Sequence, residues 1–120
     1  MLGSAPAFSG YSVDDIPAAK RFYGDLLGVA VTEENGMLVL HTPGERTTLL
    51  YPKPDHQPAT FTVLNFQVDD VEAAVDALTG LGVTFEKYEW VDEKGINRQG
   101  GPLIAWFRDP AGNILSVLES

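Results

Sequence analysis

The sequence predicts an α+β fold made of two copies of one β-α-β-β-β module. The first observation is an internal repeat, because the segment SVDDIPAA at 12–19 returns as QVDDVEAA at 67–74. The second is that both amphipathic stretches end in Leu-Gly-Val, at 27–29 and 81–83. The third is that apolar runs with strand-like alternation surround each stretch. A period of roughly 55 residues, present only twice, indicates paired supersecondary modules and not a solenoid.

The first module is predicted to span about 8–51, beginning with a strand at 8–13. Asp14 or Asp15 is expected to cap a helix with Pro17 in its first turn, where a missing N–H costs nothing. The apolar stripe of this helix consists of Ala19, Phe22, Tyr23, Leu26 and Leu27. Strands at 29–33, 37–42 and 47–51 follow, the first two joined by the turn Asn35-Gly36.

The second module is predicted over about 61–119, after a proline-rich linker at about 52–60. It begins with a strand at 62–68 and a helix capped by Asp69 or Asp70. The apolar stripe of that helix consists of Val71, Ala74, Val75 and Leu78. Strands are expected at 83–90, 103–107 and 114–118, with a polar insertion at 91–102. That insertion is either a lid or binding loop, or a mobile hairpin tip. We expect the 120 residues to form a single domain.

Composition excludes several classes of function. The formal net charge is −9 without a basic patch, so nucleic-acid binding is not expected. The acidity serves either ordinary solubility or the attraction of a cationic ligand. The absence of cysteine excludes disulfides and thiolate metal sites. No apolar run is long enough for a membrane span, and residues 1–7 lack the pattern of a signal peptide, so a cytoplasmic protein is expected.

Three segments together resemble one known family. They are FYGDLLGV at 22–29, the Val-Asp-Asp that opens each helix, and FRDPAGN at 107–113. They resemble the vicinal oxygen chelate superfamily, which includes glyoxalase I, extradiol dioxygenases, fosfomycin-resistance enzymes and bleomycin-binding proteins. The resemblance covers nearly the whole chain. It implies that the two modules curl into an incomplete barrel with helices outside and a cavity inside, and that the protein is a homodimer.

Strand alternation predicts which side chains enter that cavity. The apolar positions in each strand, such as Leu64, Phe66 and Val68, are expected to pack under the helices. The other face then supplies the ligand-binding candidates, which are Phe8, His41, Leu49, Tyr51, Val63, Asn65, Gln67, Trp106, Arg108 and Ser116. A mostly apolar, aromatic lining with a few polar groups is typical of a small-molecule pocket.

The resemblance also identifies the metal-ligand positions of the family, on the first and last strand of each module. Those positions are Phe8, Leu49, Val63 and Ser116, and none is a ligand of the usual His, Glu or Gln kind. We therefore predict no metal and no cofactor. The chain has two histidines, and the one in the linker, His56, is expected to be exposed to solvent.

Several candidates have two interpretations. His41 is a structural group or an acid–base catalyst, and Tyr51 is a proton donor or a hydrogen-bonding group for a ligand. Arg108 binds a ligand carboxylate or pairs with a neighbouring acid. Phe8 and Trp106 stack on a ligand or fill the core. Trp90 is a lid residue or a dimer contact.

Three functions remain open from the sequence. The first is a metal-free binding protein for a small organic molecule, aromatic or cationic, held in the cavity between the modules. The second is a glyoxalase- or dioxygenase-like enzyme, a lyase or isomerase, with atypical site residues. The third is an accessory domain with a vestigial cavity. Fold alone does not choose among them.

Overall fold

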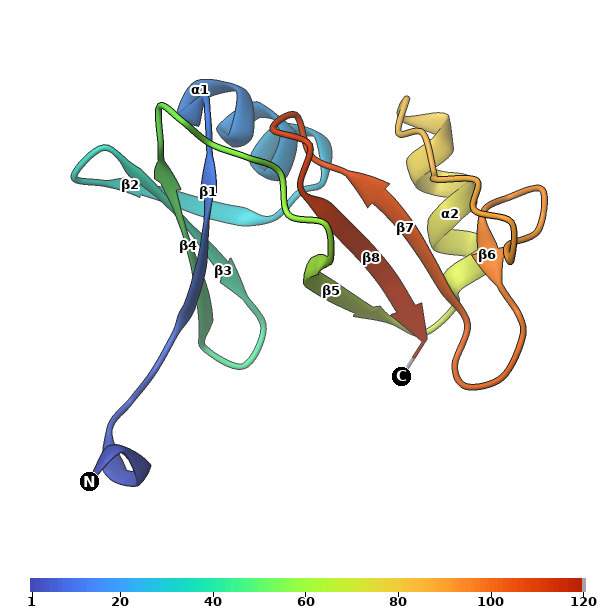
Figure 1. Ribbon diagram of the computed structural model, residues 1–120, viewed down its shortest axis with the longest axis horizontal. Coiled ribbons are helices and arrows are strands. Elements are labelled where there is room, and N and C mark those ends of the chain that lie inside the picture. Colours follow the sequence, from blue (N-terminus) through green and yellow to red (C-terminus); the bar gives the residue numbers. More distant parts are fainter. Residues whose placement is uncertain (120) are drawn as a thin grey trace. The chain divides into compact units, whose positions relative to one another are not determined.

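The computed structural model describes residues 1–119 and consists of two compact units, Met1–Gln57 and Pro58–Ser120. Each unit contains a four-stranded mixed sheet and one principal helical segment (Figure 1). The strand orders are β1-β4-β3-β2 and β5-β8-β7-β6. The predicted α+β class with two β-α-β-β-β units is therefore confirmed. The boundary between the units falls inside the predicted linker.

The first unit begins with a short 3-10 turn and contains four strands. Its elements are η1 (Leu2–Ser4), β1 (Ser9–Val13), α1 (Ile16–Ala19), η2 (Lys20–Leu26), β2 (Ala30–Glu34), β3 (Met37–Thr42) and β4 (Arg46–Pro52). β1 runs parallel to β4, and the pairs β3–β4 and β2–β3 are antiparallel. The β2–β3 turn is the predicted one, because Asn35 and Gly36 have φ values of 54° and 79°, the signs that a type I′ hairpin requires.

The helical segment of the first unit changes type after one turn. Asp15 is the N-cap, and its carboxylate accepts a hydrogen bond of 3.0 Å from the Ala18 amide. After α1 the chain continues as the π-helix η2. Tyr23 in η2 is fully buried, and the Tyr11 hydroxyl donates a hydrogen bond of 2.8 Å to the Tyr23 hydroxyl. The strand side chains buried in this core include Tyr11, Val13, Leu38, Leu40 and Leu50.

The second unit has a regular helix. Its elements are β5 (Thr62–Val68), α2 (Val71–Gly80), β6 (Ile96–Asn97), β7 (Ile104–Arg108) and β8 (Ile114–Glu119). Asp70 caps α2 and accepts a hydrogen bond of 3.0 Å from the Ala73 amide. α2 packs on β7 and β8 (Figure 1). The side chains buried in this core include Val71, Val75, Phe85, Ile96, Ala105, Phe107, Leu115 and Val117.

The predicted strand at 83–90 is wrong. Only Phe85 forms an isolated bridge there, to Phe107, and the edge strand of the sheet is β6, inside the predicted polar insertion. The reason is that Ile96 is completely buried and takes the edge position beside Ala105. Gly95 permits this placement, because it has φ +87° and lies close to Phe85 and Glu86. The insertion is therefore anchored in the core and is not a free hairpin tip.

Candidate functional site

Each sheet has one face packed under its helical segment and one face on the other side, which we call the open face. In the second unit, Ala105, Phe107, Leu115 and Val117 are buried under the helix. Asn65, Gln67 and Arg108 belong to the opposite face and are exposed. Alternation therefore separates the two faces as the sequence predicts.

The centre of the second open face is one row of paired residues. Asn65 is opposite Ser116, and Ser116 is opposite Trp106. The buried Ser116 hydroxyl donates a hydrogen bond of 2.5 Å to the Asn65 Oδ1 atom, which leaves the Asn65 amide nitrogen as a donor for another group. Three predicted site residues are thus brought together. Gln67 and Arg108 lie in neighbouring rows on opposite sides of this one.

A register irregularity changes one predicted position. Between Thr62 and Leu64 the pairing of β5 with β8 shifts, so that Val63 is the extra residue of a bulge. Thr62, opposite Ile114, then shares the open face with Asn65. Its hydroxyl accepts a hydrogen bond of 3.1 Å from the Trp106 Nε1 atom. Strict alternation predicted Val63 at this place, and it does not account for a bulge.

Three aromatic rings form a contiguous cluster on this side of the second unit. The Tyr88 ring makes an edge contact with Trp106 at a centroid distance of 5.6 Å and stacks on Trp90 at 4.8 Å with an interplanar angle of 12°. We call Tyr88, Trp90 and Trp106 the aromatic cluster. Sequence reasoning missed Tyr88, although it alternates with Glu86 and Trp90 in the segment that was predicted as a strand.

Arg108 is not a free anion clamp. Its Nε atom pairs with the Glu86 carboxylate, and its Nη1 atom donates a hydrogen bond of 3.2 Å to the Gly112 carbonyl. The hydrogen bond to Glu86 raises the pKa of the Arg108 guanidinium. Of the two interpretations from the sequence, the ion pair with a neighbouring acid is the one that the structure contains.

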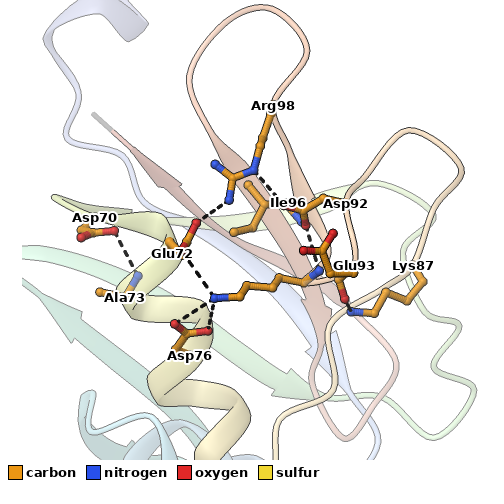
Figure 2. Close-up of polar contacts among 10 residues, drawn as sticks. Asp70, Glu72, Ala73, Asp76, Lys87, Asp92, Glu93, Ile96 and Arg98 are labelled. Atoms are coloured by element: carbon orange, nitrogen blue, oxygen red, sulfur yellow. Dashed lines mark hydrogen bonds and ion pairs between the residues drawn. The ribbon is translucent and has the colours of Figure 1, made fainter.

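The segment that bears Tyr88 and Trp90 is fastened by a polar network, drawn in Figure 2. Asp92 Oδ1 accepts hydrogen bonds of 2.9 Å from the amides of Lys94 and Ile96, and Asp92 Oδ2 accepts one of 2.8 Å from Arg98 Nε. Burial disfavours the Asp92 charge, but the hydrogen bonds from Arg98, Ile96 and Lys94 outweigh it and lower its pKa.

Helix α2 supplies the other half of this network. Glu72 pairs with Arg98 Nη2 at 2.5 Å and with Lys94 Nζ at 3.5 Å, and Asp76 pairs with Lys94 at 3.0 Å (Figure 2). The hydrogen bond to Asp76 is the main cause that raises the pKa of Lys94. The loop is therefore tied to α2 as well as to β7.

The first unit keeps its two catalytic candidates apart. His41 is exposed, and its Nε2 atom lies 2.8 Å from the Thr32 hydroxyl. His41 is opposite Thr47, four residues before Tyr51 on the same strand, which places Tyr51 about 13 Å along the sheet. The two side chains do not converge on one substrate atom. Phe8 precedes β1 and is 69% exposed, while Leu49 is half-buried.

The prediction that His56 is exposed to solvent is wrong. The ring is partly buried, and its Nδ1 atom lies 2.6 Å from the Ser12 hydroxyl of β1. The physical reason is a turn in the linker, closed by the hydrogen bond from the His56 amide to the Lys53 carbonyl, which brings the ring back to the strand.

The residue types at the metal positions of the family do not fit a metal ion. Phe8, Leu49 and Val63 have no donor atom in their side chains, and Ser116 is used by Asn65. Replacing Val63 by Thr62 across the bulge adds only a hydroxyl. Within residues 1–119, no group of three or more histidine, aspartate or glutamate side chains is arranged to hold a metal ion. No helix in that part of the chain is long and apolar enough to cross a membrane.

Comparison with solved structures gives fold similarity over the whole chain. A lactoylglutathione lyase from Agrobacterium tumefaciens has 22% identity and a TM-score of 0.69, covering 97% of this chain and 94% of the other. A glyoxalase family protein from Enterococcus faecalis has 22% identity and a TM-score of 0.70, covering 99% and 100%. TnmS3, an antibiotic binding protein from Streptomyces sp. CB03234, has 22% identity and a TM-score of 0.67, covering 97% of each chain.

A search of curated protein sequences finds no match. A family model does match, over residues 7–117, and it confirms the resemblance stated from the motifs. The chain belongs to the Glyoxalase/Bleomycin resistance protein/Dioxygenase superfamily.

Proposed function

We propose that the protein binds a small organic molecule without a metal ion, on the open face of the second sheet. The observation that supports this most directly is the row formed by Asn65, Ser116 and Trp106. It combines a half-buried indole, fixed by Thr62, with an exposed amide whose oxygen is already bonded. Such a pairing of an apolar ring with a few oriented polar groups is typical of ligand sites.

The amide nitrogen of Asn65 and the side chain of Gln67 supply the polar contacts in this proposal. Both are exposed on a strand whose alternate residues are apolar. A ligand that covered them without hydrogen bonds would bind about 1–3 kcal/mol less tightly for each unpaired group. The ligand is therefore expected to offer acceptors to these amides and an apolar ring to Trp106.

Metal-dependent chemistry is not proposed, because three of the four metal positions of the family have side chains without a ligand atom and the fourth, Ser116, offers only a hydroxyl that bonds to Asn65. TnmS3, which has a similar fold, is an antibiotic binding protein, and this supports a binding role for the present chain. We also propose that the protein is a homodimer, as the family resemblance implies, and that it is cytoplasmic, as expected for a chain without cysteine. Sedimentation at micromolar concentration tests the dimer.

The test is a thermal-shift and tryptophan-fluorescence titration of protein treated with a chelator. Metal-free bleomycin and S-lactoylglutathione serve as probes of the binding and lyase alternatives, each with and without added Ni²⁺ or Zn²⁺. We expect a ligand to raise the melting temperature equally with and without the metal. This thermal shift should be lost in Asn65→Ala and Trp106→Phe but kept in Leu81→Ala. Turnover of S-lactoylglutathione that requires added metal would contradict the proposal and support the enzyme.

A further inference from the structure

The aromatic cluster becomes more exposed along its length. Trp106 is half-buried in the sheet, Tyr88 contacts its edge, and Trp90 is 51% exposed. Tyr88 stacks on Trp90 with nearly parallel rings, so it covers one face of that indole. Since Tyr88 occupies one face of the indole, the opposite face of this half-exposed residue is the flat apolar surface on which a ligand could stack.

The segment that bears this surface is anchored at several points. The Glu86 amide donates a hydrogen bond to the Trp106 carbonyl at the start of the segment 86–98. Further along the segment, Ile96 is buried and Asp92 accepts hydrogen bonds from two backbone amides. Lys87 Nζ also donates to the Glu93 carbonyl at 2.6 Å (Figure 2). A ring held in place loses little conformational entropy when a ligand stacks on it.

The charge near the open indole favours a cation. Glu89, between Tyr88 and Trp90 in the chain, is exposed and has no ion-pair partner in the described residues. Two other carboxylates at 86–93 are already paired, Glu86 with Arg108 and Asp92 with Arg98. The exposed Glu93 carboxylate is not in an ion pair in the described residues, and Lys87 donates to the Glu93 backbone carbonyl. The two carboxylates without an ion pair outnumber the one such cation, so the remaining charge of this segment is negative. The face of an indole attracts positive charge, and the net charge of −9 adds a long-range attraction.

We propose that the outer face of Trp90, backed by Tyr88, stacks on a planar aromatic ligand that bears a positive charge, and that Asp92 positions this pair. The inference rests on the proposed function and deepens it, because it names the ligand class and extends the site from Trp106 to Trp90. Trp90 and Glu89 are the specificity-determining residues. Asp92 is a positioning residue and touches no ligand.

The experiment compares three tricyclic probes of similar size: N-methylacridinium (cationic), acridine at neutral pH (uncharged) and anthracene-9-carboxylate (anionic). Their dissociation constants are measured by fluorescence titration with the full chain. The wild type is expected to bind the cation most tightly and the anion most weakly. Trp90→Ala should weaken binding of the cation about two- to fivefold, the usual range for an exposed cation–π contact. Glu89→Gln should weaken binding of the cationic probe but leave binding of uncharged acridine unchanged.

The Asp92→Asn variant tests the positioning role by a spectroscopic signal that a general loss of stability would not change. This substitution should reduce the near-ultraviolet circular dichroism of the stacked Tyr88–Trp90 pair. It should also weaken binding of the cationic probe, as Trp90→Ala does. The melting temperature is measured in parallel, and Asp92→Glu should restore part of both signals. Leu81→Ala is the matched control, an exposed apolar residue of the same unit outside the cluster, and it should change neither.

Two results would overturn the inference. One is equal affinity for the three probes, or unchanged affinity in Trp90→Ala, while Trp106→Phe still loses binding. That pattern would leave the proposed function standing and remove only the extension. The other is that Trp90→Ala changes the sedimentation of the protein without changing probe affinity, which would make the exposed indole a contact between copies of this chain.

Discussion

The two units share a topology but use it differently. By register, Gly10, Leu49 and Val39 of the first unit occupy the positions of Asn65, Ser116 and Trp106 in the second. The first set has no hydrogen-bonding side chain, whereas the second has three. A Cβ on Gly10 would lie 2.7 Å from the Leu49 carbonyl oxygen, so the position that corresponds to Asn65 has no room for a side chain. In this row the two units share the strand pairing, but only the second unit carries polar side chains.

The edges of the two sheets differ as well. In the first unit, residues 27–29 lead directly from the helical segment into the edge strand β2. In the second, the corresponding connection runs from α2 to the edge strand β6 over residues 81–95, and it places Tyr88 in contact with both Trp90 and Trp106. Long connections in compact domains are often functional, and this one bears the rings that the first unit lacks.

The largest effect is expected from breaking the second core. Phe107 is almost fully buried and contacts Phe85, so Phe107→Ala should cost about 3–5 kcal/mol of unfolding free energy. Urea melts measure the loss, and hydrogen exchange should locate it in 58–119 more than in 1–57. Phe61→Ala, at a 67% exposed position, is the control and should cost far less. Equal loss of protection in both ranges would show that the units unfold together.

Sequence reasoning predicted the elements wherever local signals were strong. The Asx caps at Asp15 and Asp70, the Asn35-Gly36 turn and the strands at 37–42 and 62–68 follow from local chemistry. The strand at 83–90 failed because alternation there reflects packing of Phe85 and not a ladder. The observed edge strand of the second sheet depends on Gly95 and Ile96, and these residues make contacts with segments distant in the sequence.

The candidate site was predictable only in part. Asn65, Ser116 and Trp106 follow from strand parity, and the structure brings them together. Predicting Thr62 as a site residue would have required knowledge of the bulge in β5. Predicting Tyr88 would have required the position of a segment that has no regular strand pairing. Backbone irregularities have no signal in a single sequence, which explains why these two residues were missed.

The second prediction tests the different edges. Gly95→Ala should cost about 2–4 kcal/mol, because the residue has φ +87° and a Cβ would lie 3.0 Å from both Glu86 O and Phe85 Cβ. Gly36→Ala in the first hairpin has φ +79° with nothing within 4 Å, so it should cost only about 1–2 kcal/mol. Urea melts followed by far-ultraviolet circular dichroism compare the two, because both tryptophans lie in the second unit and would not report on the first. Equal costs would mean that Gly95 matters for its dihedral alone.

The third prediction concerns acid. Asp92 has a pKa lowered from 3.8 in the folded chain, so its stabilisation is complete above that value and is lost as the pH falls through the folded pKa. Asp92→Asn should cost roughly 1–2 kcal/mol at neutral pH. The difference from the wild type should shrink as the pH falls below about 3.8, because the unfolded chain then gains a proton that the folded carboxylate, with its lower pKa, still resists. A difference that stays constant down to pH 3, on the order of one unit lower, would contradict the assignment.

The smallest effect compares ion pairs of the two units. Lys20–Glu33 in the first unit is a single exposed pair at 3.0 Å, whereas Glu72 in the second contacts both Lys94 and Arg98. Isolated exposed pairs contribute little, since water screens them and ordering two long side chains costs entropy. Glu33→Gln should therefore leave the melting temperature unchanged, and Glu72→Gln should lower it by about 2–4 °C at low ionic strength. Calorimetry repeated at about 1 M salt should remove that difference, because screening is nearly complete there. If Glu72→Gln behaves like Glu33→Gln at low salt, the ion pairs to α2 in Figure 2 do not hold the loop, and the hydrogen bonds of Asp92 with the burial of Ile96 hold it instead.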